Sequence, residues 1–212
     1  MPTLTIALVS QKGGAGKSTL ALHLAAEASA QSQRALLIDL DPQGNVAKWG
    51  DRRGDTPPDV SAEHPANLDK ALRAAAAEGY GLIVLDTAPH ADQTALRAAK
   101  SADLVLVPCR PATFDLEAVR TTLDLCQLTK RPAIVVLNAA PVRSRIVDEA
   151  QHAVSDHGGA VCPVVVHQRV AFQHCLIDGR TAAEFEPGGA AALEIAALYA
   201  DVLSRLNAGV PA

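Results

Sequence analysis

The chain has 212 residues, of which 49% are hydrophobic and 20% are charged, a composition that excludes a disordered protein and predicts one well-buried domain over residues 1–212. A formal net charge of −4 argues against a dedicated nucleic-acid binder, so any contact with DNA must come from a local patch or an assembled dimer. No apolar run approaches the ~20 residues that span a bilayer, and the first residues lead into a strand without a signal-peptide pattern, which predicts a cytoplasmic protein.

Short apolar runs alternate with helical patterns along the chain. The runs are nearly continuous in Val, Ile and Leu, as is typical of parallel strands covered on both faces. The predicted strands are Leu4–Val9, Ala35–Asp39, Leu82–Asp86, Leu104–Pro108, Ala133–Asn138 and Ala160–Val166, with an edge strand near Val60. The predicted helices are Lys17–Gln31, Asn67–Glu78, Gln93–Ser101, Phe114–Thr129, Ile146–His157 and Gly189–Asn207. This alternation predicts an α/β fold, with a doubly wound, mostly parallel sheet flanked by helices on both faces.

A glycine-rich segment, 10–19, lies between the first predicted strand and the first predicted helix. Its glycines let successive backbone N–H groups face an anion, and the helix N-terminus favours negative charge. Lys17 would reach the β- and γ-phosphates of a nucleotide, and the Ser18 hydroxyl would bind Mg²⁺. The pattern departs from the usual phosphate-binding loop by having Gln11 in place of the first glycine and an additional lysine, Lys12. The residues predicted to bind the nucleotide here are Gly13, Gly14, Ala15, Gly16, Lys17, Ser18 and Thr19.

Acidic residues end the second and third predicted strands, at the edge of the sheet where ligands bind. An apolar strand closed by Asp86 is typical of a Walker B strand, which holds the metal, although a helix cap or a turn is the alternative for this residue alone. Asp39 and Asp41 lie two positions apart, so on a continuing strand both would face the phosphates. One of the two aspartates can then join Ser18 and Asp86 around the metal, while the other orients the attacking water. The sequence after Asp39 is also good turn chemistry, and both interpretations can hold together.

Three motifs, 12–19, 39–45 and 85–89, together resemble the deviant Walker A, A′ and B motifs of ParA/MinD-type ATPases. The similarity covers essentially the whole chain, which is most similar to small ParA/ParF plasmid partition proteins without an N-terminal helix-turn-helix domain. The resemblance implies a P-loop ATPase that uses Mg²⁺ and hydrolyses ATP to ADP and phosphate. It also implies a cycle of DNA segregation. An ATP-bound homodimer binds DNA non-specifically on the nucleoid, and a ParB-like centromere-binding or adaptor partner stimulates hydrolysis and release.

The resemblance also implies a role for individual residues. Lys12 matches the signature lysine that crosses to the nucleotide of the other subunit, where a second cation would offset charge on the γ-phosphoryl group. Asp41 matches the switch aspartate that positions water, which leaves Asp39 for the metal with Ser18 and Asp86. Asp86 matches the Walker B aspartate. Asn138 matches an asparagine that reads adenine, since its amide can donate and accept together. Ala139 departs from the family, which usually has a basic residue at this position.

Basic residues later in the chain are candidates for contacts with DNA phosphates, which would be additive and sensitive to salt. Arg143 and Arg145 are predicted to begin a helix, and the segment containing Arg169 and Arg180 resembles the corresponding ParF segment. An ordinary solvated charge is the alternative for each of them. Arg110 follows the predicted strand Leu104–Pro108, in a loop that resembles the family's loop near the dimer face. It is therefore either an interface residue or a solvated charge.

Three other functions remain open. Positioning of a protein cargo such as carboxysomes or chemoreceptors uses the same ATPase cycle, and the sequence does not separate cargo types because a partner protein reads the cargo. A MinD-like membrane switch needs a basic amphipathic C-terminal helix, whereas residues 204–212 offer one basic residue. A metabolic or electron-transfer relative, such as a dethiobiotin synthetase or a nitrogenase iron protein, is the third. The four widely spaced cysteines show no supporting cluster pattern and are predicted to be reduced thiols in or near the core.

Overall fold

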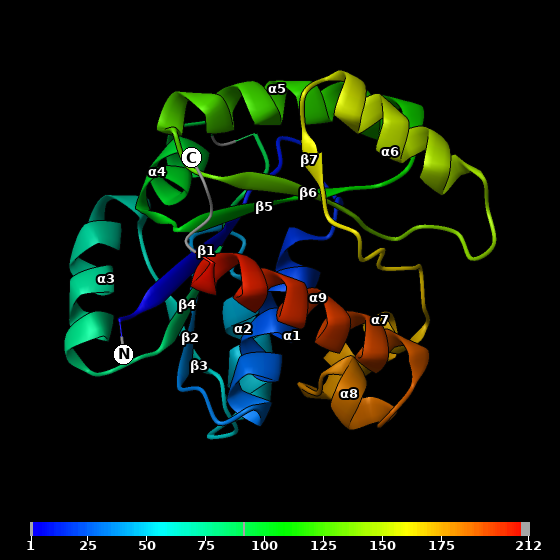
Figure 1. Cartoon of the computed structure of the whole chain (residues 1–212). Helices are drawn as coiled ribbons and strands as arrows, with labels where there is room; N and C mark the ends of the chain where they lie inside the picture. The colour runs from blue at the N-terminus through cyan, green and yellow to red at the C-terminus, as the bar shows by residue number, and fades with distance from the viewer. Residues whose placement is uncertain (1, 91, 209–212) are drawn as a thin grey trace.

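A computed structural model describes residues 2–90 and 92–208 of the chain. Over these residues, seven parallel strands form one sheet in the order β3-β2-β4-β1-β5-β6-β7 (Figure 1). The strands are β1 (Leu4–Leu8), β2 (Ala35–Asp39), β3 (Asp59–Ala62), β4 (Leu82–Asp86), β5 (Leu104–Cys109), β6 (Ala133–Leu137) and β7 (Ala160–Val161). The doubly wound parallel sheet and the edge strand near Val60 are therefore confirmed.

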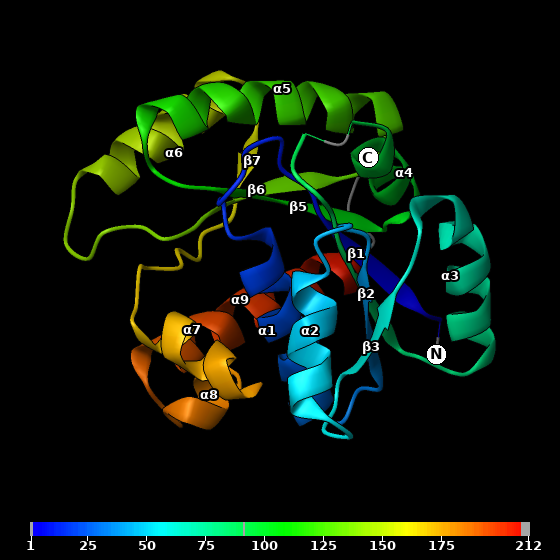
Figure 2. The same ribbon diagram turned by 180° about the vertical axis from the view of Figure 1, so that it is seen from behind.

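Helices cover both faces of this sheet (Figures 1 and 2). One face carries α1 (Lys17–Ala30), α2 (Asn45–Arg53), α7 (Ala171–His174), α8 (Ala182–Phe185) and α9 (Ala190–Asn207). The other face carries α3 (Leu68–Ala77), α4 (Asp92–Ser101), α5 (Thr113–Thr129) and α6 (Ile146–Asp156). Two short 3₁₀ helices, η1 (Pro65–Asn67) and η2 (Cys175–Asp178), connect these elements. Six of the helices were predicted from the sequence, each to within a residue or two at its ends.

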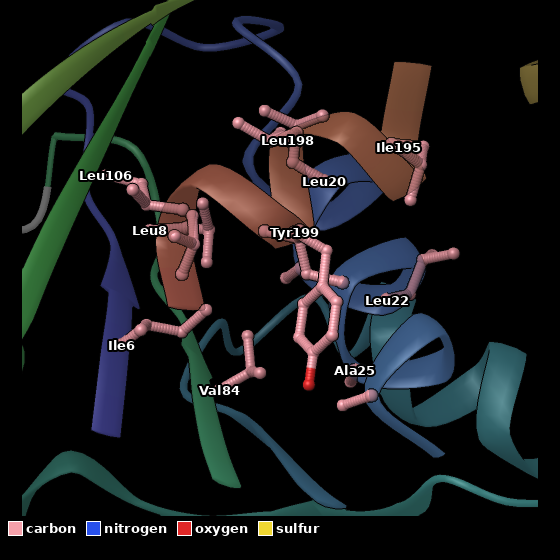
Figure 3. Close-up of a cluster of buried hydrophobic side chains, with 14 of the residues drawn as sticks. Ile6, Leu8, Leu20, Leu22, Ala25, Val84, Leu106, Ile195, Leu198 and Tyr199 are labelled. Carbon is pink, nitrogen blue, oxygen red and sulfur yellow. The ribbon is translucent and has the colours of Figure 1, made fainter. Parts of the chain in front are cut away.

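Two hydrophobic cores, one on each face, hold β1 at the centre of the sheet. Ile6 and Leu8 of β1 pack with Leu20 of α1 and Tyr199 of α9 (Figure 3). Ala7 points to the opposite face, as the two-residue period of a strand requires, and is fully buried there. Both faces of β1 are thus fixed by packing. The loop that follows β1 starts from a rigid support.

The last predicted strand, Ala160–Val166, is largely wrong, because ladder pairing with β6 covers only Ala160 and Val161. Pro163 follows almost at once, and proline has no N–H to donate to a ladder. The chain then runs beside the end of β6 without regular pairing until an isolated bridge joins Ala140 to His167. This irregular course brings the segment after residue 166 to the carboxyl edge of the sheet.

Helix α2 (Asn45–Arg53) is absent from the sequence prediction. It buries only Val46 and Trp49, so its apolar face was too narrow to recognise as a helical repeat. Its N-terminus lies at Gly44, which has a left-handed backbone (φ 62°) after the turn predicted at residues 41–44. The turn prediction was correct, but the helix that it opens was missed.

Candidate nucleotide-binding site

A cavity of about 630 Å³ lies at the carboxyl edge of the sheet, where the loops after several strands meet. About half of the residues singled out from the sequence line it. These are Gly14, Gly16, Lys17, Ser18, Thr19, Asp41, Asn138, Arg169 and Arg110. The other predicted site residues do not line it, namely Lys12, Gly13, Ala15, Asp39, Asp86, Arg143, Arg145 and Arg180. The sequence assigned no role to a second group of lining residues. It includes Thr87 and Pro89 of the motif 85–89, and His167, Gln168, Phe172, Gln173 and Leu176.

The glycine-rich loop needs glycine at two positions for its backbone. Gly14 and Gly16 have φ values of 74° and 95°, in the left-handed region that other residues rarely adopt. At Gly16 the restriction is also steric, because a Cβ atom there would lie 2.0 Å from Nδ2 of Asn138. Gly16 is the N-cap of α1, so the positive end of this helix stands at the cavity wall, where an anion is favoured.

The two lysines of the loop are in different environments. The Lys17 ammonium donates to the carbonyl oxygens of Ser10 (3.1 Å) and Lys12 (3.3 Å). Burial lowers the pKa of Lys17, and the charges of Asp86 and Asp41 oppose that shift. The Lys12 side chain is partly exposed, and its ammonium has no hydrogen bond or ion pair with any other residue that the structure describes. Lys12 therefore has its charge available for a ligand or a second subunit.

Asp86 and Ser18 form a site that fits Mg²⁺. The Ser18 hydroxyl donates to Oδ2 of Asp86 at 2.6 Å, while the buried Oδ1 has no hydrogen-bond partner among the described residues. Burial raises the pKa of Asp86 to about 7; the hydrogen bond from Ser18 lowers it, and the nearby charge of Asp39 raises it. A hydroxyl beside a carboxylate is a donor set that Mg²⁺ prefers, and a cation would give the unpartnered oxygen its missing contact.

Asp39 has a structural role that the sequence did not predict. Its Oδ1 accepts a hydrogen bond from the backbone N–H of Asp41, and its Oδ2 accepts one from Ala47, both at 2.9 Å. It therefore holds the loop after β2 and caps the first turn of α2. Because β2 ends at Asp39, the two aspartates do not share the face of a continuing strand, contrary to the expectation. Asp41 lines the cavity, whereas Asp39 is only 2% exposed.

Asn138 braces the phosphate loop from the end of β6. Its Nδ2 donates to the carbonyl oxygen of Ala15 at 2.8 Å, and the side chain is 6% exposed. It also lines the cavity, beside Ala139. Recognition of adenine by Asn138 stays a prediction. Because this hydrogen bond holds Nδ2 of Asn138 close to position 16, only glycine fits at that position.

Glu194 of α9 holds the far wall of the cavity in place. Its Oε1 accepts hydrogen bonds from Arg169 Nη2 (2.6 Å) and His167 Nδ1 (2.8 Å), and its Oε2 accepts one from the His167 backbone (3.0 Å). Burial alone would raise the pKa of Glu194, but the hydrogen bonds from Arg169 and His167 outweigh burial and lower it. The one signal for this wall in the sequence was the run of polar residues 167–169 after the predicted strand 160–166. Their partner Glu194 lies 25 residues or more farther along the chain, so the local sequence did not point to it.

The four arginines proposed for DNA fall into two pairs. Arg143 and Arg145 are exposed, but α6 begins at Ile146, so they precede the helix that they were predicted to begin. Arg169 and Arg180 already have carboxylate partners, Glu194 at 2.6 Å and Asp178 at 2.8 Å. A guanidinium that is already paired has less charge to offer a phosphate, so Arg143 and Arg145 are the better candidates for DNA contacts.

Residues 6–182 match the CobQ/CobB/MinD/ParA nucleotide binding domain. The chain belongs to this family. This ParA/MinD-family ATPase is 30% identical to the maintenance of carboxysome distribution protein A of Gloeobacter kilaueensis, over 95% of the chain and 93% of that protein. It is 28% identical to the chromosome-partitioning ATPase Soj of Thermus thermophilus, over 95% and 96%. The septum site-determining protein MinD of Pyrococcus horikoshii, solved with Mg-ADP, has the same fold, with a TM-score of 0.77, 17% identity and 98% of each chain covered.

ATP and Mg²⁺ are the cofactors of this ATPase, as its family implies. Its thiols do not form an obvious metal centre: all four cysteines are free and buried, as predicted, and the described residues contain no group of three or more His, Cys, Asp or Glu that could hold a metal ion. Burial raises the pKa of Cys109 and of Cys126 to about 12. Within residues 2–90 and 92–208, no helix is both long and apolar enough to cross a membrane. Residues 209–212, part of the tail considered for a membrane switch, lie outside the described residues.

Proposed function

We propose that this ATPase is a DNA-partition ATPase whose ATP-bound form is a nucleotide-sandwich dimer that binds DNA non-specifically. In this cycle, a ParB-like or adaptor partner stimulates hydrolysis, and the ADP-bound form releases the DNA. The observation that carries the proposal is the second lysine of the phosphate loop. Lys17 is turned into the loop, whereas Lys12 is partly exposed with no hydrogen bond or ion pair to another described residue, as a cation meant for a second subunit requires.

Each part of the cavity then has a task. Lys17 and the backbone N–H groups of residues 13–19 bind the phosphates, and Ser18 with Asp86 holds Mg²⁺, which when bound would neutralise charge on the phosphates. Asp41 positions the attacking water from the loop after β2. Asp39 supports that loop through its two backbone hydrogen bonds, in addition to any place that it takes around the metal. Lys12 of the second subunit stabilises the charge that develops on the γ-phosphoryl group.

A second candidate is the positioning of a protein cargo by the same ATPase cycle. It is supported by the 30% identity to a protein named for carboxysome distribution, which is about as strong as the 28% identity to Soj. Deleting the gene for this protein distinguishes the two candidate functions. Loss of a replicon from daughter cells supports partition, and clustering of a protein assembly with all replicons retained supports cargo positioning.

The variant Lys12→Ala tests the dimer mechanism. We expect it to bind ADP like the wild type but to lose ATP-dependent dimerisation, and with it at least about tenfold of the stimulated ATPase rate, because a cation at the γ-phosphate is removed. Sedimentation with ATP and a phosphate-release assay measure the two effects. Lys70→Ala is the matched control, since Lys70 is an exposed lysine on α3.

The control is expected to keep wild-type dimerisation and turnover. If Lys12→Ala dimerises with ATP and hydrolyses it at the wild-type rate, the sandwich mechanism is wrong for this chain. If Lys12→Ala also loses ADP affinity, the lysine acts within its own subunit and the proposed crossing is wrong.

A further inference from the structure

Arg110 lies in a tightly held turn at the end of β5. The carbonyl oxygen of Arg110 accepts hydrogen bonds from the backbone N–H of Ala112 (2.8 Å) and from the thiol of Cys109 (3.2 Å). The carbonyl of Cys109 in turn accepts the backbone N–H of Asn138 at 2.8 Å, which ties the turn to β6. The backbone from which the Arg110 side chain extends is thus fixed on both sides.

The guanidinium of Arg110 lies over the phosphate loop. Its Nη2 atom is 3.5 Å from the place where a Cβ atom of Gly14 would stand, and its Cζ atom is 4.0 Å from it. The residue lines the same cavity as Lys17 and Ser18. Although Arg110 is exposed, its side chain therefore lies against the nucleotide site of its own subunit.

The charge of Arg110 has no acidic partner among the residues that the structure describes. Some other arginines of the chain are paired, as Arg53 is with Glu184, Arg169 with Glu194 and Arg205 with Asp201, each at 2.6 or 2.7 Å. Others, such as Arg143 and Arg145, are exposed and have no ion pair with a described residue, so it is the place of Arg110 over the phosphate loop that sets it apart. An arginine held over an anion-binding loop, with no carboxylate in ion-pair contact, is arranged for an anion that arrives with a ligand. Its planar fork of N–H donors matches phosphate oxygens in pairs.

We propose that Arg110 binds the phosphate chain of the nucleotide in its own subunit. It is then a third cation of the site, beside the buried Lys17 of its own subunit and the crossing Lys12 of the partner subunit. The proposal rests on nucleotide binding in this cavity, and it is independent of DNA, cargo and partner protein. The sequence left two interpretations of Arg110 open, an interface residue or a solvated charge. The folded chain adds a third, a residue that binds the nucleotide of its own subunit.

The test is the affinity of the monomer for Mg-ADP, measured by titration calorimetry at a protein concentration where sedimentation shows no dimer. We expect Arg110→Ala to raise the Kd for Mg-ADP by about 10- to 100-fold, the range for a lost hydrogen bond to a charged group. Arg110→Lys keeps the charge but not the fork, so an intermediate Kd is expected. Arg120→Ala, an exposed arginine on α5, is the matched control and should stay within about twofold of the wild type.

Three outcomes would overturn the proposal. The first is an Arg110→Ala variant that binds Mg-ADP within about twofold of the wild type and loses only ATP-driven dimerisation, which would make Arg110 an interface residue. The second is an equal loss of affinity in Arg120→Ala. The third is a nucleotide-free melting temperature that falls in both Arg110 variants, which would make the loss of affinity a consequence of misfolding. A wild-type protein that binds no Mg-ADP would overturn the nucleotide site itself, whereas failure of DNA binding alone would leave this result untouched.

Discussion

Gly16→Ala is expected to lower the free energy of unfolding by about 2–5 kcal/mol and to weaken nucleotide binding by about 100-fold or more. The new methyl group would lie 2.0 Å from Nδ2 of Asn138, a buried side chain, and the backbone at position 16 has φ 95°. Asn138 must move, and the carbonyl oxygen of Ala15 then loses its 2.8 Å hydrogen bond. Denaturant unfolding of the nucleotide-free protein and titration with Mg-ATP measure the two effects.

The control for this prediction is Gly13→Ala in the same loop. No atom lies within 4 Å of a Cβ placed at Gly13, so a cost below about 1 kcal/mol is expected. A second test adds Asn138→Ala to the Gly16 variant, which removes the clash and should make the double variant about 1–2 kcal/mol more stable than the sum of the single changes predicts. Equal costs at positions 13 and 16, or strict additivity of the pair, would contradict the account of the loop.

Asp86→Asn is expected to have opposite effects on activity and on stability. Mg²⁺-dependent ATPase activity should fall by at least about 100-fold, because the carboxylate that faces the metal is lost. The nucleotide-free protein should become more stable by about 1–2 kcal/mol at pH 8. Ionising a buried carboxyl with a pKa of about 7 lowers the stability of the folded wild type by up to ~4 kcal/mol at that pH, and the substitution removes this penalty. The new amide group would lack a hydrogen-bond partner at the buried Oδ1 position, which costs about 1–3 kcal/mol and reduces the net gain.

The pH dependence of the stability gives this prediction its control. The pKa of Asp86 is raised in the folded state, so in the wild type its contribution to stability is fully present below the unfolded pKa near 4 and is lost as the pH rises to about 7. The advantage of Asp86→Asn should therefore grow between pH 5 and pH 8, as measured by urea unfolding without nucleotide. If the variant is less stable than the wild type at pH 8, or if its gain in stability is the same at pH 5 and pH 8, the ionised Asp86 carboxylate does not destabilise the fold and the prediction is wrong.

The sequence predicted those features of the fold and the site that depend on local chemistry. Nearly continuous apolar runs identified the central strands, and the left-handed conformations of Gly14 and Gly16 agree with the glycine spacing of the phosphate loop. The meeting of Ser18 and Asp86 also agrees with the sequence, because parallel strands bring their carboxyl ends to one edge. Each of these inferences needs only a strand, a turn and the direction of the chain.

Features set by contacts between distant segments could not be predicted. Asp39 was predicted to bind the metal, whereas its two backbone hydrogen bonds follow from the loop after β2 and from a helix that the sequence pattern did not reveal. The cavity wall at residues 167–176 depends on Glu194 of α9, and nothing in the local pattern connects them. The place of the Arg110 guanidinium beside Gly14 likewise depends on how the loop after β5 packs against the phosphate loop, which no local pattern reveals.

DNA binding as a function of nucleotide and salt tests the central claim most directly. Purified protein is titrated onto a DNA duplex of arbitrary sequence with ATP, with ADP and without nucleotide, each at about 50 and 200 mM salt. The Asp41→Ala variant, expected to bind ATP without hydrolysing it, is measured beside the wild type. The account predicts binding with ATP only, a steep loss of affinity at the higher salt concentration, and persistent binding by the variant. Equal binding with ATP and ADP, or no binding under any of these conditions, would contradict it.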